Sequence, residues 1–201
     1  QEPAITPELI ANHGLKPADY QAVPGNDSRL AQFLVQKDID AAALRTVTLA
    51  LNVDDCAAPS VDHLGKKLRQ KITSRASRLV EVCSRVGTKY GIPLINKRLA
   101  ISPASTILAG HGHAAAVQVA KTLDAAAADC GVDFVGGFTA LVHKGITPAD
   151  ETVIRSLPEV LAHTDRVCAS VNVASRKAGI NMDAVHQMGH VLLRIAEATA
   201  D

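Results

Sequence analysis

The sequence predicts an α/β fold in which parallel strands alternate with helices and form part of a barrel. Short runs of aliphatic and β-branched residues recur between amphipathic stretches, as in a series of β–α units. The predicted strands are apolar on one face and polar on the other, whereas an open sheet covered by helices on both sides is apolar throughout. A chain of 201 residues, 47% hydrophobic and 20% charged, suits one such domain with an extension.

Residues 1–42 are predicted to be a helical extension that precedes the barrel domain of residues 43–201. A proline in a first turn and Gly14 as a stop signal indicate a short helix over 7–13. A turn cluster then leads into a second helix over 28–37.

Four strands and their crossover helices are expected in the barrel domain. The strands are predicted at 46–53, 93–102, 133–137 and 166–173. The helices are predicted over about 60–89, in a short segment after Ser102-Pro103, over 113–129, in two pieces that begin at Thr147-Pro148 and Leu157-Pro158, and over 183–199. Strands joined by helical crossovers indicate a parallel sheet with right-handed connections.

One face of the predicted sheet is polar, because side chains alternate along a strand with a period of two. This face contains Thr48, Asn52 and Asp54 from the first strand, Asn96, Arg98 and Ser102 from the second, and Cys168, Ser170 and Asn172 from the fourth. Val47, Leu49 and Leu51 lie on the opposite face of the first strand. Helices outside and a polar lumen inside would account for this pattern.

Composition excludes several classes of function. The net charge is +1, so neither nucleic acid nor an anionic membrane is expected as a partner. No apolar run approaches the roughly 20 residues of a membrane span, and the N-terminal segment lacks the features of a signal peptide. The four cysteines form no C-x-x-C pair, which is typical of reduced thiols in a cytoplasmic protein.

Five long segments resemble the bacterial "PFL-family" of unknown function, named for its likeness to pyruvate formate-lyase and anaerobic ribonucleotide reductase. They are RTVTLALNVDDC (45–56), KITSRASRLVEV (71–82), GIPLINKRLAISP (91–103), GVDFVGGFTALVHKG (131–145) and DRVCASVNVASRKAGINMDAV (165–185). The resemblance covers about residues 43–195 and fails before Arg45.

The resemblance implies that this chain is the N-terminal half of a ten-strand α/β barrel. A second subunit or self-assembly would supply the other half, unless the chain is a processed fragment. We favour a second subunit, because a half-barrel has an unpaired strand edge and exposed apolar surface. Radical chemistry is not implied, since the radical glycine and loop cysteine of glycyl-radical enzymes belong to parts that are missing here, and no cofactor is expected.

The resemblance and the polar face together suggest a subunit of a non-radical enzyme that acts on a small anionic or carbonyl-bearing metabolite. Asp54 and Arg98 are candidate catalytic residues, although the two could instead simply form a pair. Cys56, at the end of the first strand, is either a nucleophile or a buried inert thiol. Acid–base or electrostatic chemistry of the lyase, isomerase, cyclase or hydrolase class would fit.

The remaining candidates are predicted to bind the substrate. Gly136 and Gly137 are expected to end the third strand and to let a ligand approach the backbone. The full set of predicted binding residues is Asn96, Gly136, Gly137, Ser170, Asn172, Lys144 and Asn181. The alternatives are a polar network that holds the barrel together, a tight turn at the glycines, and a solvated lysine. A non-catalytic metabolite-binding module or a structural subunit therefore also remains open.

His111 and His113 are two histidines beyond the second strand that could bind a metal or move protons. No third ligand is evident, so no metal site is predicted. The same segment fits the pattern G-x-G-x-x-A, but the residues before it look helical, so a dinucleotide site is not expected.

Overall fold

The structure is a computed structural model and describes residues 46–91 and 94–200. The helices predicted over 7–13 and 28–37 lie outside the described residues. The chain divides into two units between Thr46 and Val47, and the elements below belong to the second unit apart from Thr46 itself.

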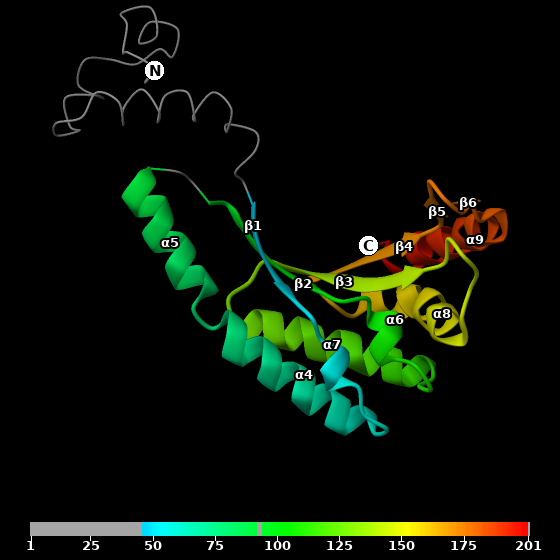
Figure 1. The fold of residues 1–201 in the computed structure, drawn as a ribbon, viewed down its shortest axis with the longest axis horizontal. Helices are drawn as coiled ribbons and strands as arrows, with labels where there is room; N and C mark the ends of the chain where they lie inside the picture. Colours follow the sequence, from blue (N-terminus) through cyan, green and yellow to red (C-terminus); the bar gives the residue numbers. More distant parts are fainter. Residues whose placement is uncertain (1–45, 92–93, 201) are drawn as a thin grey trace, which may run out of the picture. The chain divides into compact units, whose positions relative to one another are not determined.

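A parallel four-strand sheet forms the centre of the second unit (Figure 1). Its strands are β1 (Thr46–Leu51), β2 (Asn96–Ile101), β3 (Phe134–Leu141) and β4 (Val167–Asn172). They lie in the order β1-β2-β3-β4, the same as their order along the chain. The predicted parallel sheet with helical crossovers is confirmed. Because right-handed crossovers between successive neighbours all fall on one side, this order leaves the other side to be covered by something else.

Most of the helices form a row beside the sheet. The helices are α4 (Val61–Ala76), α5 (Leu79–Tyr90), α6 (Ala104–Ile107), α7 (His113–Asp129), α8 (Pro148–Ala162) and α9 (Met182–Ala198). Helices α4, α6, α7 and α8 lie on the same side of the sheet in Figure 1. Helix α4 packs on α7, α7 on α8, and α8 on α9, whereas α5 stands apart from this row and contacts β2.

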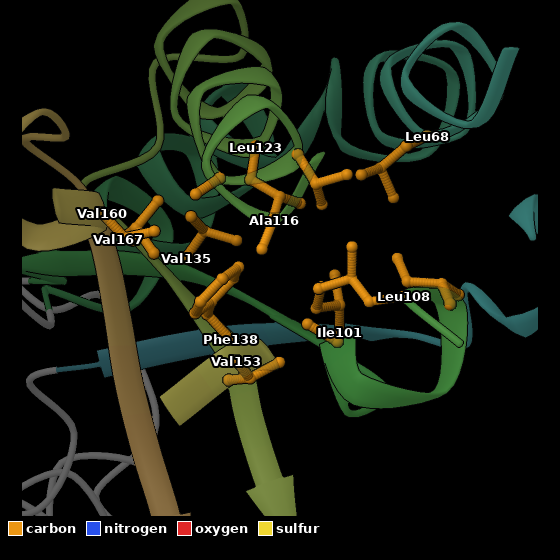
Figure 2. Packing of buried hydrophobic residues seen from close by; sticks show 14 of the residues in the cluster. Leu68, Ile101, Leu108, Ala116, Leu123, Val135, Phe138, Val153, Val160 and Val167 are labelled. Carbon is orange, nitrogen blue, oxygen red and sulfur yellow. The ribbon is translucent and has the colours of Figure 1, made fainter. Parts of the chain in front are cut away.

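The hydrophobic core lies between the sheet and this row of helices. Figure 2 shows Val135 and Phe138 of β3 pointing toward Ala116 and Leu123 of α7. The largest fully buried side chains are Phe138, Leu64, Leu68, Ile72, Leu99, Ile107, Leu108, Leu123, Ile154, Val53 and Val119. With almost no aromatic residues, the core is built mainly from aliphatic side chains, so its packing depends on close contacts between helices and sheet.

The predicted helix over 60–89 is wrong, because two helices, α4 and α5, occupy this range with a break at Ser77 and Arg78. Helix α4 buries a residue on every turn up to Ala76. Beyond the break, the buried stripe ends, and only Cys83 of α5 is buried. The apolar period therefore continues into α5 without being buried there, which the periodicity alone could not reveal.

Helix α8 is continuous, whereas two pieces were expected around Pro158. The helix runs through this proline, which is buried together with Leu157. Proline costs the helix one hydrogen bond, but burial of both side chains against the core favours the helical path. Thr147 and Asp150 form a capping box at the first turn, with the Asp150 N–H donating to Thr147 Oγ1 at 3.2 Å.

Strand β3 extends to Leu141, so the expectation that Gly136 and Gly137 end it is wrong. The register between β3 and β4 shifts between Gly136 and Phe138, which makes Gly137 a β-bulge. Its φ is +106°, and a Cβ there would lie 2.4 Å from the backbone oxygen of Ile101. Glycine is therefore required inside the strand, where it permits close approach of β2 rather than a turn.

The sheet face opposite the helix row is the open face, because no described residue of the second unit forms a layer over it. Its residues are Thr48, Ala50, Arg98, Ala100, Phe134, Gly136, Thr139, Leu141, Cys168, Ser170 and Asn172. The predicted alternation is confirmed in β4, where Cys168 and Ser170 are exposed while Val167 is buried. Strand β2 begins at Asn96, later than the predicted start at residue 93, and Ile95 just before it is exposed.

Candidate functional site

The candidate site lies at the carboxyl ends of β1 and β2, where Asp54 gathers three side chains. Its carboxylate accepts hydrogen bonds from the hydroxyls of Ser102 (2.9 Å) and Thr106 (3.0 Å) and from Nδ2 of Asn52 (3.2 Å). The N–H of Asp54 donates to Asn52 Oδ1 at 2.8 Å, and the N–H of Val53 donates to Ser102 Oγ at 3.0 Å. In α/β folds, this edge of a parallel sheet is where ligands bind.

Asp54 is exposed, and its charge is stabilised. The hydrogen bond from Ser102, followed by that from Thr106, lowers the pKa of the Asp54 carboxyl below its ordinary value. The next residue, Asp55, points elsewhere and binds Lys71 of α4, whose hydrogen bond lowers the pKa of Asp55. The two adjacent carboxylates are both ionised at neutral pH, but only Asp54 belongs to the strand-end cluster.

Arg98 and Asn96 lie near the other end of β2. Arg98 is four residues before Ser102, which corresponds to about 13 Å along a strand. Its guanidinium lies over the ring of Phe134, 5.2 Å from the ring centroid, in a cation–π contact. The alternative in which Arg98 pairs with Asp54 is therefore wrong. The predicted catalytic pair is split between the two ends of the open face.

Two hydroxyls meet on the open face between β3 and β4. Thr139 and Ser170 are register partners, and their hydroxyl oxygens lie 2.8 Å apart. Asn172 ends β4, accepts a hydrogen bond from the Ala174 N–H through Oδ1 (3.3 Å), and is exposed. Ser170 and Asn172 are thus together on one strand, as predicted, and the structure adds Thr139 to them.

The other predicted binding residues are dispersed. Gly136 is on the open face opposite Cys168, and Lys144 is exposed in the loop after β3. Asn181 caps α9: its Oδ1 accepts from the Ala184 N–H at 3.2 Å and its Nδ2 donates to the Val142 carbonyl at 2.8 Å. The Asn181 amide therefore joins the start of α9 to the end of β3 instead of facing a ligand.

Cys56 has the environment of an inert thiol. It is 2% exposed, and burial raises the pKa of its thiol above the ordinary value. Its Sγ–H donates to Asp55 Oδ1 at 3.9 Å, and the negative charge of Asp55 adds to the rise in the thiol pKa. Cys83 and Cys130 are also buried, whereas Cys168 is exposed on the open face, and all four thiols are free.

His111 and His113 point to different partners. His111 Nε2 lies 2.9 Å from the Ala58 carbonyl oxygen, and His113 Nε2 lies 2.7 Å from Glu159 Oε2. Within residues 46–91 and 94–200, no group of three or more His, Cys, Asp or Glu side chains could hold a metal ion. A short helix, α6, precedes this segment where a dinucleotide fold requires a strand.

His143, at the end of β3, was missed by the sequence analysis. Its Nδ1 is buried and has no hydrogen-bond partner among the described residues. Buried polar atoms are nearly always paired, so this nitrogen lacks the partner it requires in this part of the fold. Thr106 and Thr139 were also missed. Thr106 follows Ser102 by one helical turn, a spacing that could have indicated it, while Thr139 lay beyond the predicted end of its strand.

The cluster and the open face form a wall instead of an enclosed pocket. A cleft of about 300 Å³ lies at the opposite, amino-terminal edge, where it is lined by residues 131–133, Asp165 and Arg166. Another, of about 460 Å³, lies between α5 and the segment leading into β2. Neither contains Asp54 or Ser170. The arrangement can orient an ionised carboxylate and several hydroxyls, but a second wall is needed to exclude water.

None of the helices in the described ranges is long and apolar enough to cross a membrane.

Comparison with known proteins places the chain in a family. The model of the family described as "Uncharacterised ACR (DUF711)" matches residues 36–201. A UPF0210 protein of Desulfovibrio desulfuricans is 51% identical over 158 residues, which is 79% of this chain and 34% of that protein. UPF0210 proteins of Methanococcoides burtonii and Listeria monocytogenes are 50% and 48% identical over 158 residues, again 79% of this chain and 35% of each protein.

The chain thus spans about a third of the length of the curated relatives it matches. The matches give no evidence for a relationship to pyruvate formate-lyase, so that part of the expected resemblance is left without support. The family match covers the described sheet and all of its helices, and the chain belongs to the DUF711 (UPF0210) family.

Proposed function

We propose that the open face is one wall of a polar barrel lumen and that the chain is a subunit of a non-radical enzyme. Its substrate would be a small anionic or carbonyl-bearing metabolite. The observation that carries this proposal is the hydrogen-bonded carboxylate of Asp54 at the carboxyl edge of a sheet face that no described residue of the second unit covers. Catalytic groups of α/β barrels are found at this edge.

Asp54 supplies the reactive group in this proposal. Hydroxyl donors from Ser102 and Thr106 fix its orientation and lower the pKa of its carboxyl. An oriented carboxylate can accept a proton from a substrate or stabilise positive charge in the transition state. We assign Cys56 no part in this chemistry because it is buried and its thiol pKa is raised.

A cation at the carboxyl edge would hold the anionic end of the substrate. Lys144 lies in the loop after β3 at this edge. Arg98 lies at the other end of the open face, too far from Asp54 for one small molecule to contact both, so it has no part in this step. Ser170 and Thr139, between these ends, offer hydroxyls to a carbonyl or hydroxyl group.

The order of the strands and the one-sided packing of the helices support the barrel in this proposal. Strands in sequential order with helices on one side are what a barrel wall requires, and the polar open face is compatible with a lumen. A half-barrel would be completed by another part of the family fold. The likeness to the pyruvate formate-lyase barrel is proposed for the fold alone.

A ligand screen tests the proposal. We expect one or more small carboxylates, 2-oxo acids or phosphate esters, at about ten times their Kd, to stabilise the purified chain by about 1.4 kcal/mol. For a domain of this size, this corresponds to a rise of about 3–6 °C in Tm. Asp54→Asn should abolish the rise. The matched control is Asp55→Asn, which removes the same charge one residue away and should retain it.

Equal shifts in the two variants, or no shift with any compound class, would contradict the proposal. The active compound is then followed by NMR for conversion, in the chain and in a completed barrel. Loss of turnover with assembly intact in Asp54→Asn supports the enzyme.

A non-catalytic binding or structural subunit is the second candidate. The observation that favours it is that the polar groups here already form hydrogen bonds with one another. Thr139 is bonded to Ser170 on the open face, and Ser102 donates to Asp54 in the strand-end cluster. Tight binding without conversion of any related compound would identify a binding module. Indifference to every substitution on the open face would identify a structural subunit.

A further inference from the structure

Helix α9 is the last member of the helix row, and one of its sides is uncovered. It packs on α8 through Ala184 and Val191, both buried, and through a 2.8 Å hydrogen bond from Gln187 Nε2 to Glu151 Oε2. Within the row, α7 and α8 each have a helix on both sides, and α4 is the first helix, at the β1 end. In the described chain, α9 has a neighbour on one side only.

The uncovered side of α9 carries an apolar stripe. We define the α9 stripe as Met182, Val185, Leu192 and Leu193, which are 65%, 38%, 58% and 65% exposed. The first three are separated by three and seven residues, so they lie along one face of the helix. Gly189 falls between them on the same face and leaves open space, since a Cβ there would meet nothing within 4 Å. The stripe is thus an apolar ridge with a notch.

Polar residues flank the stripe. His186 and His190 lie one turn apart with their rings 4.9 Å from each other, and Arg194 follows one turn later. Protein interfaces combine an apolar centre with a polar rim of this kind. Exposed apolar patches with a polar rim are typical of sites that contact another protein segment.

The free edge of β4 is at the same end of the series as α9, because β4 is the last strand of the sheet and α9 the last helix of the row. The sheet order ends at β4, so one edge of this strand has no partner among the described strands. The carbonyls of Arg166 and Asn172 accept hydrogen bonds from β3. Because residues of a parallel strand alternate in direction, Val167, Ala169 and Val171 therefore direct their N–H and C=O groups toward the free edge.

We propose that the α9 stripe and the free edge of β4 together dock the next β–α unit of the family fold: a parallel strand along β4 and an amphipathic helix along the stripe. Two observations identify this occupant. The sheet and the helix row both grow in chain order, so the next unit belongs at this end. The curated relatives also contain about two thirds of their length outside the matched region, which is ample for such units.

This inference rests on the proposed function only in treating the chain as part of a larger barrel, and it holds whether one chain or two carry the fold. It assigns no role to Asp54. A second copy of this chain is the competing occupant, since the stripe of one α9 could also cover that of another.

A chimera tests the inference. The 158 matched residues of the Desulfovibrio desulfuricans relative are replaced by the corresponding residues of this chain, within the full length of that relative. Hydrogen exchange is then compared with that of the isolated 201-residue chain. We expect the amides of Ala169 and Val171 to exchange at least about tenfold more slowly in the chimera, because a new strand accepts from them.

Leu192→Asp tests the stripe in the same two proteins. In the isolated chain the residue is exposed, so the rate of native-state proteolysis should change less than about twofold. In the chimera a buried carboxylate should increase the rate at least about tenfold. The control is Val86→Asp on α5, an apolar position outside the stripe that is 38% exposed, which should behave alike in both proteins.

Leu192→Asp with the same small effect in both proteins overturns the inference, as does unchanged exchange at Ala169. A chimera that fails to fold where the relative folds also counts against it, because the surfaces would not match. A dimer of the isolated chain that Leu192→Asp dissociates identifies a second copy as the occupant. None of these readouts involves a ligand, so a failed ligand screen leaves the docking surface standing, and the reverse also holds.

Discussion

The pKa of the Asp54 carboxyl is lowered because neighbouring side chains donate hydrogen bonds to it, with Ser102 contributing most. Removing a donor destabilises the carboxylate relative to the carboxylic acid, so we expect Thr106→Val to raise the pKa of Asp54 toward the ordinary value near 3.9. Ser102→Ala should raise it further. The measurement is a titration of the Asp54 carboxyl carbon by NMR.

Thr106→Val tests the hydrogen bond to Asp54 without removing a partner of a buried backbone N–H, whereas Ser102→Ala does both. Ser102 Oγ accepts from the buried Val53 N–H as well as donating to Asp54, so Ser102→Ala leaves a backbone donor unpaired and should cost about 1–3 kcal/mol of stability. A pKa of Asp54 that stays fixed in both variants would show that the hydroxyls do not hold the charge.

Gly137 is a single residue on which the sheet depends. A methyl group there would lie 2.4 Å from the Ile101 oxygen and 2.6 Å from its Cγ1, at a φ that side chains disfavour. We expect Gly137→Ala to destabilise the fold by at least about 3 kcal/mol, measured by urea unfolding. Gly136→Ala is the control, since its Cβ would come no closer than 3.9 Å to Leu99 O; it should cost no more than about 1 kcal/mol. Similar losses in both would contradict the bulge.

At the scale of elements, Asp150 joins helix α8 to strand β3. It is 4% exposed, accepts from the Leu141 N–H at 3.2 Å, and accepts from the hydroxyl of Thr147 at 2.6 Å. Burial alone would raise the pKa of Asp150, but the hydrogen bonds from Thr147 and from the Leu141 backbone lower it overall. The ionised form is thus the one that fits the fold.

Asp150→Asn should therefore lower stability at pH 7 by about 1–3 kcal/mol, the value of hydrogen bonds to a charged group. A carboxyl with a lowered pKa in the folded state stabilises the fold above the unfolded pKa of about 3.9. That contribution is lost as the pH falls through the lower folded value. The difference between wild type and Asp150→Asn in urea unfolding should consequently shrink below about pH 4. A constant difference down to pH 2 would contradict this assignment.

The elements themselves were largely predictable from the sequence, and the errors have physical causes. Helix α7 begins at His113 and ends at Asp129, as its apolar period and flanking glycines predict. The break between α4 and α5 was invisible, because the apolar period continues into α5, where only Cys83 is buried. Strand β3 was cut short because glycine signals a turn in a sequence, whereas contact with Ile101 makes Gly137 a bulge.

For the candidate site, the sequence could predict only which face of a strand each residue lies on. Alternation placed Ser170 and Asn172 together and Asp54 on the polar side. It could not show that Arg98 stacks on Phe134 far from Asp54, because distances along a strand depend on where the strand begins and on rotamers. Thr106 lies on a helix, and its contact with Asp54 depends on the tertiary turn after β2.

At the scale of the whole molecule, the exposed thiol of Cys168 reports on the open face. Cys56, Cys83 and Cys130 are buried, so a thiol reagent such as DTNB should modify one cysteine of the native chain rapidly and the others only as the chain unfolds. Cys168→Ser should remove the fast reaction. Two fast thiols in the native chain would contradict this burial pattern.

Closure of a lumen would change that rate. If further β–α units complete a barrel, Cys168 lies inside it, and access of the reagent then requires an opening of the barrel. We expect the Cys168 thiol to react at least about tenfold more slowly in the full-length chimera than in the isolated chain. The chimera carrying Cys168→Ser supplies the background from the cysteines of the relative. Slow exchange at Ala169 together with an unchanged rate at Cys168 would mean that strands are added to β4 but the sheet stays open, and the enclosed lumen would have to be given up.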